Sequence, residues 1–407
     1  MQTIVYIGCN KSGTSREALS MSTAMGYYTV LLTNRKEFVK QKEEFNDVHH
    51  MVYVENLMDK EMVFTIIREL EANHKQICAV ISFIDPFVSY AARISAELGM
   101  YEMSMDALAI MEEKTRFREQ LKTLPVSPRF TIFHGEQSIL QCINEYKAYL
   151  PLVLKSPISN GSKDVLLVET PLEFKAGLDY FNKKFPSIPI LIEEYLIGPQ
   201  YLIEVIVKDG QISMVAIIEQ EILTGERFII TGYRFPAALE NETFEDLDLA
   251  VTSIIQALEL VNGTCHLEMR LINGEWKLIE INPRMSGGAM NRIIQEGTGI
   301  NLVKETIKLF LGEEINLELT QRNHVYAKFL TINSRGRLIK VKGKNRAANY
   351  EGVKEVFVKP RKGAILTKPY SLGDRYAYVI ASAKTPEQAK KIALSASNEI
   401  KFYLEPL

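Results

Sequence analysis

Short apolar runs alternate with segments of helical periodicity over the first hundred residues. The apolar runs are residues 3–8, 27–32, 50–54 and 77–83, and residues 59–72 repeat apolar side chains at helical spacing. Alternating buried strands and helices are typical of βαβ units. We therefore expect an N-terminal α/β domain built on a parallel sheet.

The pattern changes near residue 104 and again near residue 319. A helix pair is predicted over residues 105–121, and strands dominate from residue 190, with hairpin turns at Asp209-Gly210 and Asn273-Gly274. The last segment combines short strands with a helix beginning near Pro386. The whole predicts an α/β and α+β protein in four parts. These parts are residues 1–103, 104–188, 189–318 and 319–407.

Composition excludes several classes of protein. Hydrophobic residues make up 46% of the 407, charged residues 24%, and the formal net charge is −2, which favours an ordinary folded protein over a nucleic-acid binder. No uncharged apolar run reaches the roughly 18 residues of a membrane span, so we expect no membrane partner and a cytoplasmic location. The four cysteines are widely separated, and we expect them to be reduced.

The hairpin from His266 to Asn282 carries most of the candidate chemistry. A tight two-residue turn at its Asn-Gly pair would place Glu268 opposite Ile279 and mix charged with apolar side chains on both faces. A three-residue turn instead places Glu268 opposite Glu280 and the two end residues opposite each other. Because only the second register separates polar from apolar positions, we predict the three-residue turn, with Ile279 on the apolar face.

Directly opposed carboxylates repel each other unless a cation lies between them. Glu268, Glu280 and Asn282 offer hard oxygen ligands, which suit Mg²⁺. The alternative is a solvated hairpin face with incidental acids. Downstream, Arg284 offers a planar fork for a carboxylate, a phosphate or an oxyanion, and a glycine pair opens the next helix with backbone amides available to an anion.

Upstream segments supply weaker candidates. Lys155 ends an apolar strand just before a small-residue loop containing Ser162, an arrangement that favours a phosphate-covering flap. Lys114 lies on a helix whose pattern otherwise predicts a solvated surface. Residues 193–196 link two strands and could present backbone groups to an adenine edge. Pro86 follows a predicted parallel strand, where a substrate pocket often lies. Taken singly, each is also compatible with an ordinary loop or surface.

In this order along the chain, these residues resemble the ATP-grasp superfamily. Within it, the motif INPRMSGG, at residues 281–288, and the chain length resemble the L-amino acid ligases. The resemblance covers roughly residues 1–312, with the tail matched only loosely. It implies a pre-ATP-grasp N-terminal domain, a two-subdomain ATP-grasp core at 104–188 and 189–318, and a small C-terminal α+β domain.

The resemblance also implies roles for individual residues. Arg284 would be catalytic as an oxyanion stabiliser, and Gln200 stands where many relatives have a ribose-binding glutamate. The implied cofactors are ATP and Mg²⁺, with Mn²⁺ as a substitute. The implied sites are Lys114, Lys155, Ser162, Glu193, Glu194, Leu196 and Gln200 for ATP; Glu268, Glu280 and Asn282 for metal; and Arg284, Gly287, Gly288, His266 and Pro86 for substrate.

The implied activity is an ADP-forming ligase that joins two L-amino acids through an acyl phosphate, giving a dipeptide, ADP and phosphate. Its partners would be small-molecule amino acids, and the resemblance is compatible with a homodimer. Three alternatives stay open. A ligase of the biotin-carboxylase or purine-pathway type would act on bicarbonate or formate, a regulator would bind nucleotide without catalysis, and a dinucleotide oxidoreductase would use the N-terminal βαβ units. Residues 8–13 lack the third glycine of a dinucleotide fingerprint.

Overall fold

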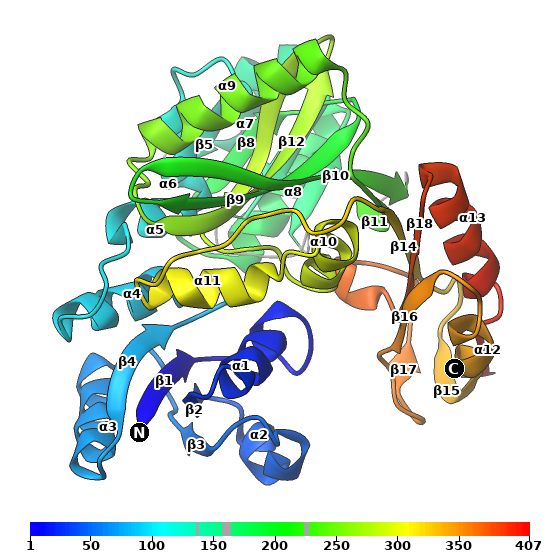
Figure 1. The fold of residues 1–407 in the computed structure, drawn as a ribbon. Helices are drawn as coiled ribbons and strands as arrows, with labels where there is room; N and C mark the ends of the chain where they lie inside the picture. The colour runs from blue at the N-terminus through cyan, green and yellow to red at the C-terminus, as the bar shows by residue number, and fades with distance from the viewer. Residues whose placement is uncertain (136–137, 157–163, 224–227) are drawn as a thin grey trace.

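The N-terminal part is a four-stranded parallel sheet in the order β3-β2-β1-β4, which confirms the predicted parallel sheet (Figure 1). The structure is a computed structural model that describes residues 1–135, 138–156, 164–223 and 228–407, so the predicted contact at Ser162 lies outside the described residues. The elements are β1 (Gln2–Ile7), α1 (Thr14–Ala24), β2 (Tyr28–Thr33), α2 (Lys36–Lys40), β3 (His50–Tyr53), α3 (Lys60–Ala72), β4 (Gln76–Ile81) and α4 (Val88–Glu97). Each strand except β3 is buried along most of its length, which explains the continuous apolar runs.

A helix pair and a small antiparallel sheet follow. The sheet has the strand order β5-β8-β6-β7, and its core is formed by apolar side chains that include Leu154 and Phe174. Because β8 pairs with both β5 and β6, we propose to draw the division between the two middle parts after Glu194 instead of after residue 188. The elements are α5 (Met105–Met111), α6 (Lys114–Leu121), β5 (Phe130–Phe133), α7 (Ile139–Tyr146), β6 (Leu152–Lys155), β7 (Val165–Val168), α8 (Pro171–Lys184) and β8 (Ile190–Glu194).

The centre of the molecule is an eight-stranded sheet in the order β13-β12-β9-β10-β11-β14-β18-β16. In Figure 1, α9 lies above the central strands, while α11 lies below them beside the N-terminal domain. The elements of this part are β9 (Gln200–Lys208), β10 (Gln211–Leu223), β11 (Ile229–Phe235), α9 (Asn241–Ala257), β12 (Gly263–Ile272), β13 (Glu275–Asn282), α10 (Met290–Thr298) and α11 (Leu302–Phe310).

The C-terminal part extends this large sheet. Strand β14 pairs with β11, and β18 and β16 add two further strands, while β15, β17 and β19 form a separate sheet. The predicted helix near Pro386 is present as α13, and the side chain of Thr385 caps it. The elements are β14 (His324–Leu330), β15 (Gly336–Lys342), α12 (Lys344–Ala348), β16 (Val353–Val358), β17 (Ile365–Leu366), β18 (Ala377–Ala383), α13 (Pro386–Ser397) and β19 (Lys401–Pro406).

The β12–β13 hairpin corrects the predicted turn and confirms the predicted pairing. The turn has two residues, Asn273 and Gly274, with φ of 50° and 88°, as a tight type I′ hairpin requires. Glu268 nevertheless lies opposite Glu280, because the register shifts between Glu268 and Met269. Ile279 is the extra residue of a β-bulge at this shift. The three-residue turn was therefore wrong, since the bulge, not the turn, supplies the additional residue.

The structure also describes the cysteines and the apolar content of the helices. All four cysteines are free thiols, as predicted. No helix within the described ranges is long and apolar enough to cross a bilayer.

Candidate functional site

A cavity of about 710 Å³, including the part open to solvent, lies where the small sheet faces the β12–β13 hairpin. It contains predicted residues from four separate segments of the chain. The lining residues that the sequence predicted are Lys114, Lys155, Glu193, Glu194, Leu196, Gln200, Glu268 and Glu280.

The two acids of the hairpin face each other across the β12–β13 ladder. Burial, together with the neighbouring charge of Glu280, raises the pKa of Glu268 to about 7. Burial acts on Glu280 in the same direction, but Lys114 and Lys155 outweigh it and hold the pKa of Glu280 below its ordinary value. No group of three or more His, Cys, Asp and Glu that could hold a metal occurs among the described residues. A metal here would therefore need the amide of Asn282 and oxygens from a ligand or water.

Lys114, at the start of α6, and Lys155, at the end of β6, lie close to these acids. Lys114 Nζ lies 3.3 Å from Glu280 Oε1. The helix that carries Lys114, α6, is not the solvated surface that its charge pattern predicts, because it buries Lys114, Phe117 and Arg118. Both lysines are 8% exposed. Their low exposure and their position beside the acids suit the binding of a polyanion together with a metal.

A buried cluster centred on Glu193 connects the small sheet to the hairpin. Glu193 pairs with Lys155 at 2.5 Å and also with Arg118, a residue that the sequence did not single out. Burial opposes ionisation of Glu193, but the two cations lower its pKa. Arg118 Nη2 and Lys155 Nζ also donate to the bulge carbonyl of Ile279, at 2.7 and 3.4 Å. Ile279 lines the cavity, so its predicted place on the apolar face was wrong.

The linker at residues 193–196 runs along one wall of the cavity. Its Glu194 and Tyr195 N–H groups donate to backbone carbonyls of the adjacent segments, at 3.0 and 3.2 Å. The Glu194 carboxylate accepts from the Arg129 N–H at 2.8 Å, and the Leu196 carbonyl accepts from Arg270. The ring of Phe228 lies 5.8 Å from that of Tyr195, and both rings line the cavity. These contacts give the cavity one fixed aromatic wall.

Gln200 is fully engaged within the protein. Its amide nitrogen donates to Gln220 at 2.8 Å and to Glu268 at 3.3 Å, while its oxygen accepts from Arg270 at 3.1 Å. A ribose contact would have to replace one of these bonds. Gln200 therefore also orients the Glu268 carboxylate, a connection that no local sequence pattern indicates.

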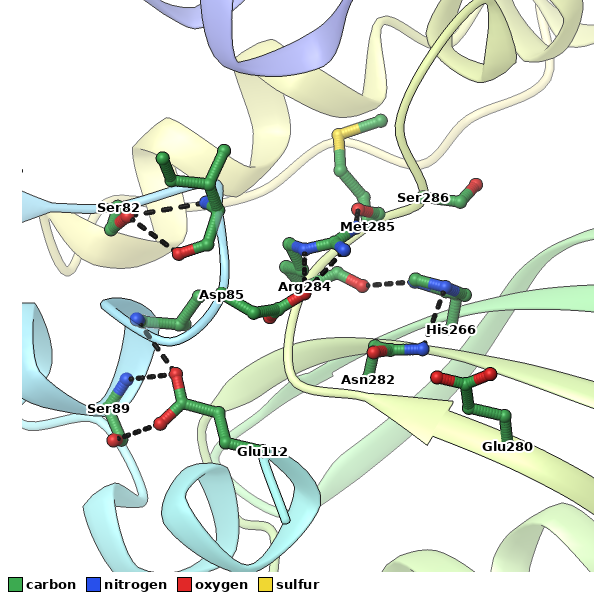
Figure 2. A network of polar contacts seen from close by, with 12 residues as sticks. Ser82, Asp85, Ser89, Glu112, His266, Glu280, Asn282, Arg284, Met285 and Ser286 are labelled. Atoms are coloured by element: carbon green, nitrogen blue, oxygen red, sulfur yellow. Dashed lines mark hydrogen bonds and ion pairs between the residues drawn. The ribbon is translucent and has the colours of Figure 1, made fainter. Parts of the chain in front are cut away.

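Beyond Glu280, hydrogen bonds connect the side chains of Asn282 and His266 to the backbone of Arg284 (Figure 2). Asn282 Nδ2 donates to His266 Nε2 at 3.2 Å, and His266 Nδ1 lies 2.8 Å from the Arg284 carbonyl. Burial, with Arg284 nearby, lowers the pKa of His266 to about 4. The neutral ring thus donates from Nδ1 and accepts at Nε2. Both nitrogens are used, which favours a positioning role for His266 over the predicted substrate contact.

The Arg284 side chain is held by a residue from the N-terminal domain. Its Nε and Nη2 lie 2.9 and 2.5 Å from Asp85 Oδ2, and the Asp85 side chain is only 7% exposed (Figure 2). The other oxygen of Asp85 has no hydrogen-bond partner among the described residues. Glu112 fixes the adjoining start of α4 by accepting from the Val88 N–H at 2.9 Å. Pro86, next to Asp85, is exposed.

The glycine pair after Arg284 is exposed, and the residue before it, Ser286, is held by Glu204. Ser286 donates its N–H to Glu204 at 3.1 Å and its hydroxyl to the same carboxylate. Glu204 is completely buried on β9, and burial raises its pKa to about 7. Gly287 and Gly288 precede α10, which begins at Met290, slightly later than predicted.

The fold, the paired acids and the two lysines agree with the predicted resemblance to ATP-grasp proteins. A model of the ATP-grasp domain matches residues 148–292, and a model described as L-amino acid ligase C-terminal domain 2 matches residues 328–405. Residues 148–292 thus match an ATP-grasp domain, and the chain is similar to the L-amino acid ligases. The second match corrects the expectation that the tail is matched only loosely.

The chain matches only part of the length of the curated relatives. An uncharacterized protein of Sinorhizobium fredii is 30% identical over 63% of this chain and 54% of its own length. The carbamoyl phosphate synthase large chain of Thermotoga maritima is 22% identical over 71% of this chain and 26% of its own. The chain thus spans about half of the first relative and a quarter of the second.

Solved structures match over the whole chain. The L-amino acid ligase from Bacillus licheniformis has a TM-score of 0.84 at 20% identity and covers 100% of this chain and 99% of its own. Phosphoribosylglycinamide synthetase from Anaerococcus prevotii has a TM-score of 0.73 at 16% identity, with 99% of both chains covered. At these identities, the likeness concerns the fold.

Proposed function

We propose that this protein is an ATP-dependent carboxylate–amine ligase that joins two L-amino acids into a dipeptide and releases ADP and phosphate. The observation that carries the proposal is the pair Glu268 and Glu280, opposed across the hairpin and faced by Lys114 and Lys155. The match of residues 328–405 to an L-amino acid ligase domain supports the amino acid substrates. Cytoplasmic location and a homodimer stay predictions.

The residues present fit Mg²⁺ and a nucleoside triphosphate. Burial and mutual repulsion raise the pKa of Glu268 to about 7, which is the signature of an acid pair that a cation would relieve. Asn282 uses its amide nitrogen on His266, so its oxygen is the atom left for a metal. Glu268, Glu280 and Asn282 would hold the ion, which would neutralise charge on the phosphates. We assign the adenine to the wall at residues 193–196, beside Tyr195 and Phe228.

In the first step, a substrate carboxylate oxygen attacks the γ-phosphorus, a P–O bond forms, and the bond to the ADP oxygen breaks. Lys114 and Lys155 lie where they would bind the phosphates and offset the charge spread over the transferring group. We assign the exposed Gly287 and Gly288 backbone to the reacting amino acid.

In the second step, the amine nitrogen forms a bond to the acyl carbon and phosphate leaves with the electron pair of the broken C–O bond. The amine loses one proton before attack and one after it. Arg284 would stabilise the oxyanion of the tetrahedral intermediate, because its guanidinium is charged and held in one orientation by Asp85. The unpartnered oxygen of Asp85 is free to accept a further hydrogen bond beside this centre.

A second candidate function is ligation that activates bicarbonate or formate. It is favoured by the fold of the biotin carboxylase from Campylobacter jejuni, which has a TM-score of 0.71 at 14% identity.

One experiment separates the two candidate functions. The purified protein is incubated with ATP, Mg²⁺ and the twenty amino acids in pairs, phosphate release is measured, and products are identified by mass. We expect a dipeptide with one phosphate released per peptide bond. Release that depends on bicarbonate or formate, with no response to any amino acid pair, would overturn the dipeptide proposal.

A further inference from the structure

A second cavity lies on the other side of Gly288, between the N-terminal domain and the outer strands of the large sheet. It encloses about 940 Å³, including the part open to solvent. One wall is formed by the loop before α1 and the first turns of that helix, with Gly13 and Glu17. The opposite wall is formed by side chains of β14, β16 and β18. No residue of this cavity other than Gly288 has a role in the site described above.

Three aromatic side chains form the floor of this cavity, and we name them the aromatic row. Phe329, Tyr378 and Phe357 are direct partners across three neighbouring strands, β14, β18 and β16. The ring of Tyr378 lies 5.2 Å from each of the other two rings. Directly paired residues on neighbouring strands point to the same face of a sheet. The row is therefore a continuous apolar surface on which a flat or bulky side chain could stack.

The charged residues around the row are Lys11, Arg16, Lys359, Arg375, Glu17 and Glu355. Lys11 and Arg16 pair with Glu44 and Asp47, two acids outside the lining. Arg375 lies over the Phe329 ring, with its guanidinium carbon 4.1 Å from the centroid.

The hydrogen bonds of Arg375 go to uncharged oxygens, those of Leu372, Ile230 and Tyr233, at 3.0 to 3.3 Å. These partners do not neutralise the charge of Arg375. A carboxylate entering the cavity would thus meet a fixed cation beside an aromatic surface.

The cavity also meets the segment that follows Arg284, because Gly288 is one of its lining residues. A Cβ at Gly13 would come within 3.1 Å of the Gly288 nitrogen, so the cavity begins where the segment after Arg284 meets the N-terminal domain. Figure 2 shows that segment leading away from Glu280 through Arg284 to Ser286. Phosphate would leave toward the metal acids. An amine must approach the acyl carbon from elsewhere, and this cavity opens at the opposite end of the segment.

We propose that this cavity binds the amine substrate and takes an amino acid with an aromatic or large apolar side chain. The side chain stacks on the aromatic row, the carboxylate pairs with Arg375, and the amine faces Gly288. This assignment rests on the proposed ligase function, because only a two-substrate ligation requires an amine site. The assignment specifies the class of amine substrate, which the first cavity does not indicate.

The test compares kinetics of wild type and Phe357→Ala, with phenylalanine as the amine and the residue order of the product determined by fragmentation mass spectrometry. We expect the KM for phenylalanine to rise at least tenfold and the KM for ATP to stay within twofold. Phe357→Leu, which keeps apolar bulk, should recover part of the loss. Tyr403→Ala, which removes an exposed aromatic ring on β19, should match wild type. Equal melting temperatures of all variants exclude a folding defect.

The outcomes separate this inference from the proposed function. If dipeptides form but only with small amino acids such as glycine as the amine, or if Phe357→Ala leaves the KM for phenylalanine unchanged, the amine site is wrong and the ligase proposal survives. If no amino acid pair releases phosphate, the ligase proposal fails. The affinity for phenylalanine, measured by calorimetric titration into wild type and Phe357→Ala, then tests the binding site independently of catalysis. Equal affinity, or no binding to wild type, would refute it.

Discussion

Replacing Glu204 by glutamine is expected to remove a pH dependence from the stability of the protein. Burial raises the pKa of this carboxyl from 4.5 to about 7. In the unfolded chain the group ionises near its ordinary value, so between pH 4.5 and 7 the folded protein holds a proton that the unfolded chain has lost. The stability that Glu204 contributes is therefore complete below this window and is lost as pH rises through it. The rise in pKa corresponds to roughly 3 kcal/mol.

The assay is calorimetric melting of wild type and Glu204→Gln at several pH values from 4.5 to 8. Because glutamine does not ionise, the melting temperature of the variant relative to wild type should climb by several degrees as pH rises. Glu275→Gln, which alters a side chain that is 71% exposed, is the control. Its melting temperature should change with pH in the same way as that of wild type. A constant difference between Glu204→Gln and wild type at every pH would show that Glu204 is ionised in the folded protein.

Four further substitutions test the site. Glu280→Gln should abolish most turnover by weakening the metal site, measured as phosphate release against Mg²⁺ concentration, and near-normal activity would contradict the metal assignment. Arg284→Ala should keep calorimetric ATP affinity and lower ligation by about 10²- to 10³-fold; loss of ATP affinity alone would make Arg284 a phosphate ligand. Asp85→Asn should lower kcat with the KM for ATP unchanged, and an unaltered kcat would remove the positioning role. Arg118→Met should cost about 3–5 kcal/mol in urea unfolding, because it strips a partner from a buried carboxylate; wild-type stability would show that Lys155 suffices.

The opposition of the two hairpin acids could be predicted from sequence because alternation of polar and apolar side chains constrains register strongly. The way the chain achieves it could not. Asn273-Gly274 already signals a tight turn, and that turn is present. A bulge shifts the register by only one residue. Isoleucine is common in regular strands, so Ile279 does not mark the position of the bulge in the sequence.

The burial of charged residues was the second feature that could not be predicted from the sequence. Arg118 lies on a helix of mixed charge, which usually indicates a solvated face, yet its side chain is completely buried against Glu193. Its partner is 75 residues away, so only the tertiary fold reveals the pair. Gln200 is similar, since its bonds to Gln220 and Glu268 join three different strands.

The bulge ties the phosphate side of the cavity to the metal side. Strand β13 lies at the edge of the large sheet, so the outward carbonyl of Ile279 is available to Arg118 and Lys155. The next residue is Glu280, which pairs with Lys114 from the same side. Lys155 and Glu193 lie on the small sheet, so movement of that sheet against the hairpin must break the bonds of Lys155 to Ile279 and of Glu193 to Arg118. The lysines and the metal acids therefore keep their relative positions, which is what electrostatic preorganisation of phosphoryl transfer requires.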